Sequence, residues 1–367
     1  MGEYLIEHRK EGALVAEIRG CRIFSTKPAS PAKQSSLTLI LQDLFLPKGY
    51  PNSVSPDYIA YQKWDTLQAF ASSMTSALAT EAILRGAGVG NKSASVLAAA
   101  VAWLLKDGLG MVSKIGFTWY SSSKLDSDCK TWRLVADIFN DVAFSLDLFA
   151  PMFPRVFTFI VCISSVARSI VGVAGCGTRA VVVQHQAIIG NAADVAAKDS
   201  AQETLVNVSA LLYSLILLPL ISGNITVTWV LYILFTFIHL SANYRAVMAL
   251  NLRTFNRSLL YVVTRAYIKN GSVLSVSKAN AREPLFQRLP GVRHYGVSLI
   301  DVLTPTSSTA ARFLETDFAV MYDGAKAESQ TASLAISSGS SFEAQVRGAF
   351  YAEYALATGK LVAFIFL

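Results

Sequence analysis

The sequence predicts a mainly α-helical fold: a polytopic helical membrane bundle followed by a small α/β C-terminal domain. Three observations predict it. Apolar residues make up 53% of the chain and charged residues only 16%, against about 45–50% and about 25% in ordinary soluble domains. The mean hydropathy is +0.42. Two apolar runs, 205–222 and 225–242, contain no Asp, Glu, Lys or Arg and are separated only by a short turn.

Each of these runs is long enough to cross a bilayer as a helix. At about 1.5 Å per residue, each spans roughly 27 Å, close to the hydrocarbon thickness of about 30 Å. The Ser-Gly-Asn turn between them then makes the pair a helical hairpin, and the chain an integral membrane protein. The alternative is a buried hairpin in a soluble all-α core.

The region 47–250 is predicted to be a succession of helices. Small residues are abundant inside them, and such residues let helices approach closely in lipid. Segments such as "SSSKLDSD" (121–128) and "GVAGCG" (172–177) are predicted to break the helices. Gly190 can end one helix and Asn191 can cap the next. The predicted helices cover residues 58–84, 93–117, 130–149, 154–173, 178–189, 191–218 and 225–250.

The flanking regions differ from this bundle. Residues 1–46 are predicted to form an N-terminal arm and linker, with one candidate strand at "ALVAEIR". The first residues match neither a secretory signal nor a transit peptide. Residues 251–367 are predicted to form a soluble α/β region. It would contain a basic amphipathic helix, strands at "GVSLIDVL", "DFAVMYD" and "ASLAIS", and a helix at 342–358.

The charges argue against a nucleic-acid partner, and the cysteines argue against a zinc site or a disulfide framework. The net charge is +7, but Lys and Arg form no dense block, which suits juxtamembrane positions better than a nucleic-acid surface. The four cysteines are far apart, so neither a zinc site nor a disulfide framework is expected. They are Cys21, Cys129, Cys162 and Cys176.

The start of the helix that leads into the first apolar run is strongly polar. Its candidate ligand-binding residues are Asp194, Lys198, Gln202 and Glu203. Ionisable groups in or beside a membrane are costly and often functional. Asp199 and Glu203 place like charges four residues apart, which is unfavourable unless a basic partner or ligand faces them. The alternative is a solvated helix start whose acids lie near the positive end of the helix dipole.

A second candidate cluster lies on the helix predicted at 130–149. Asp137 and Asp141 fall on one stripe with Asn140 and Asp147, and Arg133 stands four residues before Asp137. This stripe could hold a cation or relay protons. Alternatively, the carboxylates pair with arginines and lock the bundle together.

Two histidines complete the candidates. His185 is included as a ligand-binding candidate, although a buried or capping histidine is the simpler interpretation. His239, inside the second apolar run, is expected to hydrogen-bond to a neighbouring helix.

No arrangement of residues indicates catalysis. "GAGVGN" (86–91) lacks the preceding strand and the closing Lys-Ser/Thr of a phosphate-binding loop. No Ser or Cys nucleophile stands beside a candidate base. The chain is therefore expected to be non-enzymatic, with no catalytic residues and no metal ligands.

Several strings together carry a family resemblance. They include "LPKGYPNSVSPDYIAYQKWDTLQAF", "WLLKDGLGM", "WRLVADIFND", "GTRAVVVQHQ", "NAADVAAKDSAQET" and "NYRAV". In collinear order from about residue 45 to residue 286, the sequence resembles the ROOT UV-B SENSITIVE (RUS) family, most closely its animal members. Where many relatives read "AKDGSQET", this chain has "AKDSAQET", and Ile188, Ile189 and Gly190 replace residues that are often polar.

The resemblance implies a membrane-associated, largely helical protein. The family is linked in plants to ultraviolet-B responses, to pyridoxal phosphate (vitamin B) homeostasis and to auxin transport, and it supplies no catalytic set to transfer. The expected function is to bind, move or scaffold the handling of a small polar or anionic molecule. The expected partners are the lipid bilayer and another RUS-family or membrane protein. Two alternatives are a pyridoxal-phosphate-related enzyme or cofactor-binding protein, and a structural interaction module.

Overall fold

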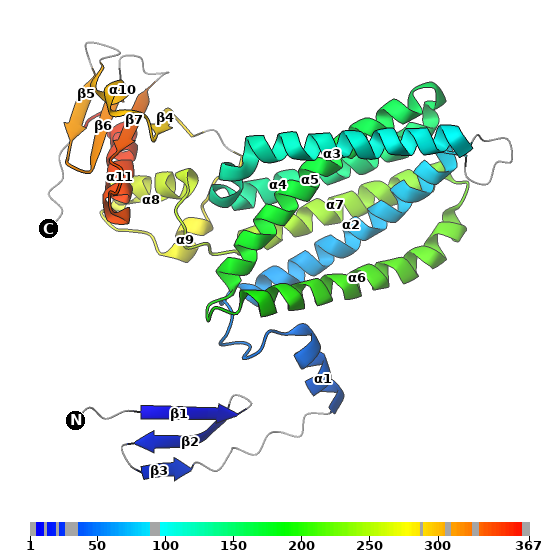
Figure 1. Cartoon of the computed structure of the whole chain (residues 1–367), viewed down its shortest axis with the longest axis horizontal. Helices are drawn as coiled ribbons and strands as arrows, with labels where there is room; N and C mark the ends of the chain where they lie inside the picture. Colours follow the sequence, from blue (N-terminus) through cyan, green and yellow to red (C-terminus); the bar gives the residue numbers. More distant parts are fainter. Residues whose placement is uncertain are drawn as a thin grey trace. The chain divides into compact units, whose positions relative to one another are not determined.

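The computed structural model describes residues 5–10, 13–19, 22–25, 36–88, 96–286, 289–304, 310–324 and 330–361. The chain divides into two compact units, Met1–Leu250 and Asn251–Leu367. The first contains the long helices and the second contains a small sheet (Figure 1).

The N-terminal part of the first unit begins with a three-stranded antiparallel sheet of order β1-β2-β3. Its strands are β1 (Leu5–Lys10), β2 (Ala13–Arg19) and β3 (Arg22–Ser25). The predicted strand "ALVAEIR" is confirmed as β2, whereas β1 and β3 were not predicted. A short helix follows, α1 (Ser36–Phe45). The predicted linker falls mainly at residues 26–35, outside the described residues.

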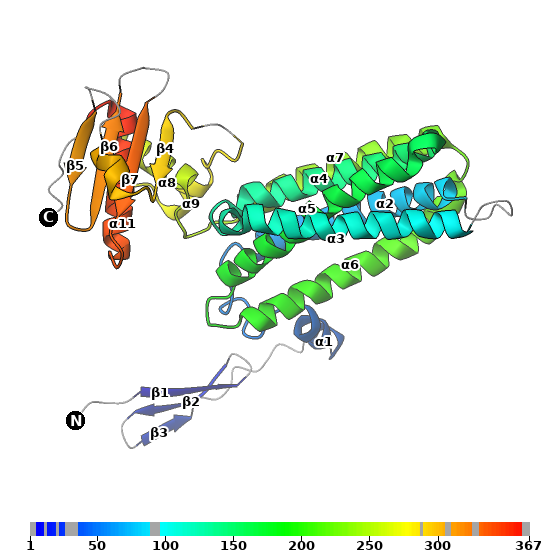
Figure 2. The same ribbon diagram turned by 45° about the horizontal axis from the view of Figure 1, so that its top comes forward.

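Within the part of the chain that the structure describes, six long helices form the bundle of the first unit, as Figures 1 and 2 show. The length of these helices is explained by their side chains more than by their caps. Long apolar stretches bury one face of each helix, and they contain few polar side chains that could compete for the backbone hydrogen bonds. The helices are α2 (Tyr58–Gly86), α3 (Val96–Ser127), α4 (Cys129–Phe149), α5 (Phe157–Gln186), α6 (Ala192–Ile221) and α7 (Ile225–Ala249). Two short turns, Ala150–Met152 and Pro154–Val156, join α4 to α5.

The prediction that "GVAGCG" breaks a helix is wrong, because α5 runs through it without interruption. At Gly177, a Cβ atom would come within 2.9 Å of Leu125 on α3. This glycine therefore permits a close approach of two helices. Similarly, "SSSKLDSD" does not end α3 early, since that helix continues to Ser127.

The two apolar runs form α6 and α7, joined by the predicted turn. Gly190 has φ +75° before α6, as a helix end favours, but the Asn191 side chain makes no capping hydrogen bond. At the other turn, the Asn224 side chain accepts a hydrogen bond from the Val227 amide and caps α7.

The two helices of the expected hairpin pack mainly on α2 and not on each other. In Figure 1, α2 lies between them. Near their shared turn, α6, α7, α2 and α4 enclose an apolar core that includes Leu78, Phe144, Leu148 and Tyr232. Helix α2 is therefore the central element of the bundle.

Within the described residues, three helical segments are long and apolar enough to cross a membrane: Pro154–Gln186, Ala192–Ile221 and Ile225–Ala249. Much of their apolar surface faces outward, including Leu215 and Phe237 with exposed fractions of 64% and 70%.

The second unit is an α/β domain. Its sheet has the order β4-β7-β6-β5, with β4 parallel to β7 and the other neighbours antiparallel. Helix α11 packs on one face and α10 on the other. The elements are α8 (Arg257–Asn270), α9 (Val276–Asn280), β4 (Val292–Tyr295), α10 (Leu299–Leu303), β5 (Ala311–Leu314), β6 (Phe318–Asp323), β7 (Thr331–Ile336) and α11 (Phe342–Thr358).

Most predictions for this unit are confirmed: the basic helix, the strands β6 and β7 and the last helix all form. The strand predicted at "GVSLIDVL" is wrong. Ser298 Oγ accepts a hydrogen bond from the Asp301 amide, and the Asp301 carboxylate accepts one from the Ser298 amide. This reciprocal capping box stabilises a helix start, so the segment forms α10.

Candidate ligand-binding site

Three predicted residues at the start of α6 face the segment that precedes α2. Asp194 accepts a hydrogen bond of 2.7 Å from the Lys48 amide. Lys198 Nζ donates to the Asp43 carbonyl. Gln202 donates to the Phe45 carbonyl at 2.6 Å and to the Tyr58 hydroxyl at 3.2 Å. These side chains attach α1 and the residues after it to α6.

The fourth predicted residue, Glu203, faces α5 together with Asp199. Arg179 lies between the two acids, 2.6 Å from Asp199 and 2.7 Å from Glu203. The like-charged pair on α6 therefore has the basic partner that it requires. Asp199 also accepts a hydrogen bond of 3.1 Å from Gln62 on α2.

His185 lies near the C-terminal end of α5. Its Nε2 atom is 2.9 Å from Asp57 Oδ2, just before α2. The Ser55 hydroxyl donates to the other oxygen of Asp57, and the Ser55 amide donates to the Gln186 carbonyl at 2.9 Å. His185 thus joins the end of α5 to the start of α2.

The acidic stripe of α4 is buried against α2 and α7. His239 of α7, which is fully buried, places Nδ1 2.8 Å from Asp141 Oδ2 and Nε2 3.6 Å from Asp137 Oδ2. The expectation that His239 bonds to a neighbouring helix is confirmed. Gln68 of α2 donates to Asp137 at 3.1 Å and lies 2.9 Å from His239 Nε2.

The arginines of this region do not all pair with the acids that the i,i+4 spacing suggests. Arg133 does not form its ion pair with Asp137; its guanidinium lies 2.6 Å from Asp65 on α2. Asp147, at the other end of the stripe, pairs with Arg168 of α5. Inter-helix geometry therefore overrides the i,i+4 spacing at Arg133.

Helix α2 connects the two predicted clusters, and sequence reasoning missed its role. Gln62 contacts Asp199, while Asp65 and Gln68 contact the residues of α4 and α7. Farther along, the Asn140 amide donates to the Ser72 hydroxyl at 3.1 Å. These polar residues recur every three or four positions along α2, so a period of 3.6 residues was the signal that could have found them.

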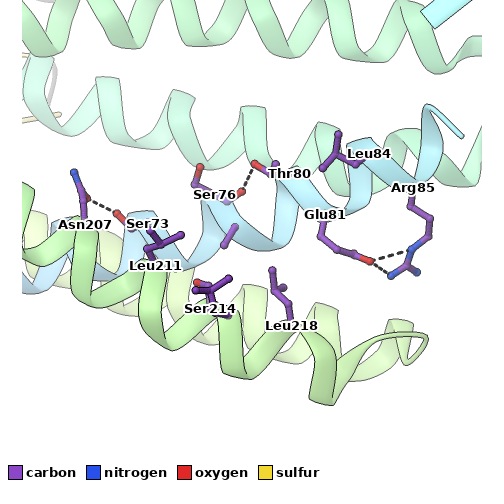
Figure 3. Close-up of a pocket in the computed structure, with 12 residues that line it drawn as sticks. Ser73, Ser76, Thr80, Glu81, Leu84, Arg85, Asn207, Leu211, Ser214 and Leu218 are labelled. Atoms are coloured by element: carbon purple, nitrogen blue, oxygen red, sulfur yellow. Dashed lines mark hydrogen bonds and ion pairs between the residues drawn. The ribbon is translucent and has the colours of Figure 1, made fainter. Parts of the chain in front are cut away.

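A groove follows the same helix toward its C-terminal end (Figure 3). It has a volume of about 810 Å³ and lies between α2 and α6. The hydroxyl-bearing side chains of α2 face leucines of α6, including Leu211 and Leu218. At one end, Ser73 donates to Asn207 at 2.6 Å, and at the other end Arg85 pairs with Glu81.

Among the residues that the structure describes, no group of three or more His, Cys, Asp or Glu side chains could hold a metal ion. The arrangement instead combines a buried network of hydrogen-bonding and charged groups with an amphipathic groove. Such an arrangement can bind a small polar molecule or pass protons between neighbouring groups.

The family of this chain is assigned from the amino-acid sequence of the region that contains the bundle. Residues 31–271 match the family described as "Vitamin B6 photo-protection and homoeostasis domain". The chain belongs to the root UVB sensitive (RUS) family. The RUS region covers all of the predicted site residues and the stretch of α2 that connects them.

RUS proteins from distant organisms are similar to this chain. It is 42% identical over 275 residues to "RUS family member 1" of Dictyostelium discoideum, which covers 74% of this chain and 52% of that protein. It is 42% identical over 239 residues to "Protein root UVB sensitive 3" of Arabidopsis thaliana, covering 65% of this chain and 54% of the relative. The chain thus spans about half the length of these RUS relatives. No solved structure matches it.

Proposed function

We propose that this RUS chain is a non-enzymatic integral membrane protein whose bundle binds, moves or scaffolds the handling of a small polar or anionic molecule. The observation that carries the proposal is the distribution of polarity. Large apolar side chains are exposed on the outer helices, whereas Asp141 and His239 are buried. Soluble monomers rarely expose large contiguous apolar patches, and ionisable groups of membrane bundles face the interior.

The groove between α2 and α6 supports a small molecule as the ligand. Its volume of about 810 Å³ falls within the range of about 300–1,000 Å³ that is usual for small-molecule sites. Hydroxyl groups on one wall can bind a polar ring, and leucines on the other wall can cover its apolar face. An anionic substituent would compete with Glu81 for the guanidinium of Arg85, which lines the groove. Because the family description names vitamin B6, pyridoxine and pyridoxal 5′-phosphate are the first ligands to test.

Membrane integration is tested by alkaline carbonate extraction of membranes that contain the full chain. We expect the protein to stay in the membrane pellet, because apolar helices are not released when ionic contacts are removed. Release into the supernatant would end the proposal for a membrane-spanning bundle.

Ligand binding is tested by equilibrium dialysis of purified protein with labelled pyridoxine and pyridoxal 5′-phosphate. Ala77→Phe adds a ring inside the groove and is expected to weaken binding at least tenfold. Ala100→Phe, at an exposed position on α3, is the matched control and should leave binding unchanged. Equal affinities of both variants for the ligand would show that the groove is not the binding site.

The rival enzyme or cofactor-binding function makes a different prediction. Pyridoxal phosphate enzymes hold the cofactor as a Schiff base with a lysine, and Lys130 at the start of α4 is a buried lysine. Visible Schiff-base absorbance, lost in Lys130→Arg, would favour the rival. If neither vitamer binds and Ala77→Phe complements a null mutant normally, the structural interaction module is favoured instead.

A further inference from the structure

His239 is enclosed by charged and polar groups from both helices that pack against α7. Asp137 and Asp141 of α4 and Gln68 of α2 lie beside the imidazole. The ion pair of Arg133 on α4 and Asp65 on α2 adjoins Asp137. Helix α7 itself adds the Tyr232 hydroxyl, which donates to the Asp141 backbone carbonyl at 2.7 Å, and the Asn243 amide, which donates to the Arg133 carbonyl at 3.4 Å.

The charges around His239 do not balance when its imidazole is neutral. Arg133 and Asp65 form one ion pair, which leaves the carboxylates of Asp137 and Asp141 beside the imidazole. Two uncompensated carboxylates inside a bundle carry a large desolvation cost. A proton on His239 halves this excess negative charge.

The hydrogen bonds of the Asp141 carboxylate also favour a charged neighbour. Its Oδ2 atom bonds to His239, but within the described residues its buried Oδ1 atom has no hydrogen-bond partner. A buried carboxylate with an unpartnered oxygen is unfavourable. A charged imidazolium at 2.8 Å stabilises that carboxylate more than a neutral imidazole can.

Gln68 relates the protonation of His239 to the contacts between helices. Its amide nitrogen lies 2.9 Å from His239 Nε2 and 3.1 Å from Asp137 Oδ2. This arrangement suits a neutral ring with its proton on Nδ1, because Nε2 then accepts from the amide. A proton on Nε2 would face the donor amide, so Gln68 must turn its carbonyl toward the ring and withdraw its donor from Asp137.

We propose that His239, Asp141, Asp137 and Gln68 form a proton-binding site, in which uptake of a proton on His239 Nε2 moves Asp137 from the Gln68 amide of α2 to the imidazolium of α7. The proton comes from aqueous acid, one N–H bond forms, and no bond in the protein breaks. The contact of Asp137 on α4 therefore changes from α2, which also lines the groove, to α7. The proton site does not depend on which small molecule the bundle handles.

The test is a titration of the full chain in lipid nanodiscs with ¹⁵N-labelled histidine. The His239 signal is assigned by its absence in His239→Gln, and NMR distinguishes imidazolium from each neutral tautomer. Between about pH 5 and about pH 9, we expect His239 to change from imidazolium to the neutral form with its proton on Nδ1. A ring that stays neutral, or stays charged, over this whole range would overturn the proposal.

Two variants locate the groups that hold the proton. At neutral pH, Asp141→Asn and Asp137→Asn should each lower the protonated fraction of His239 at least threefold, because each removes a neighbouring negative charge. Asp126→Asn, at an exposed position on α3, is the matched control and should leave it unchanged. Each variant is first checked for a single monodisperse species. If folded Asp141→Asn and Asp137→Asn both leave the fraction unchanged, the carboxylates do not hold the proton. If neither folds, the wild-type titration alone decides.

Discussion

Arg179 Nη2 of α5 lies 2.6 Å from Asp199 Oδ2 of α6, and the same guanidinium reaches Glu203. The two acids differ in their exposure to solvent: the Asp199 side chain is 12% exposed and that of Glu203 is 47% exposed. One arginine therefore makes a partly buried ion pair and a surface ion pair, so the two can be compared within one site.

Double-mutant cycles in detergent should separate the two pairs. We expect a coupling free energy of about 1.5–3 kcal/mol for Arg179→Met with Asp199→Asn, as for hydrogen bonds to charged groups that are shielded from water. Arg179→Met with Glu203→Gln should give about 0.2–1 kcal/mol, as exposed pairs do. Thermal unfolding measures both, and a larger coupling for Glu203 would contradict the expectation.

Lys198→Ala separates attachment of α1 from ligand binding. Loss of the bond to the Asp43 carbonyl should speed hydrogen exchange in residues 36–48, while overall stability falls by only a few tenths of a kcal/mol. If Lys198 also contacts the ligand, vitamer binding falls in the same variant. Lys63→Ala, at an exposed position on α2, is the control. Unchanged exchange at 36–48 would show that this contact does not hold α1.

In the second unit, Glu353→Gln should be strongly destabilising. Glu353 of α11 receives two bonds from Arg293 and one of 3.0 Å from the Tyr295 hydroxyl. Burial, together with the Glu353 carboxylate, raises the pKa of Tyr295 well above its usual value, so its hydroxyl stays a donor. Breaking this buried ion pair should cost about 3–5 kcal/mol in the unfolding of this unit.

The matched control for Glu353 is Glu315→Gln. Its pair with Arg347 is 3.8 Å long, and both side chains are 30% exposed, so we expect a loss of about 0–1 kcal/mol. Similar losses for the two glutamates, measured by hydrogen exchange in β6 and β7, would show that the Arg293 pair adds nothing beyond a surface contact.

Replacement by alanine should change the stability differently at two glycines of α5. A Cβ atom at Gly172 meets nothing within 4 Å, so Gly172→Ala should stabilise the helix by about 1 kcal/mol through helix propensity. Gly177→Ala should lose this gain, because its Cβ lies 2.9 Å from Leu125. Thermal unfolding of the two variants in parallel tests this, and equal stabilisation would refute the close approach.

Charges around α6 and α7 predict the orientation of the pair in a membrane. Lys198 lies in the first turns of α6, and basic residues follow α7, whereas the turn Ser222–Asn224 is uncharged. By the positive-inside rule, the turn should lie on the far side from the cytosol. In a cysteine-free background, Ser222→Cys and Ser272→Cys should react with an impermeant thiol reagent from opposite sides of sealed vesicles. Reaction from the same side would refute a spanning pair.

The candidate site was predicted only in part. Asp137 and Asp141 stand out because carboxylates are conspicuous on an apolar helix, and His239 because it interrupts an apolar run. Gln62, Asp65 and Gln68 are ordinary residues for a helix surface, and although their spacing places them on one face of α2, it does not identify their partners. Their partners lie on α4, α6 and α7, more than sixty residues away in the chain.

The sequence alone was sufficient for most of the long helices, for the α/β character of the last region and for the RUS resemblance, although it divided α5 in two and ended α3 too early. Hydrophobic periodicity and turn residues act over a few positions, so they can be detected without a structure. The partner of each charged side chain was not predictable in this way. Arg133 pairs with Asp65 rather than Asp137 because the rotation of each helix about its axis is set by packing against its neighbours, and this packing joins residues that are distant in the chain.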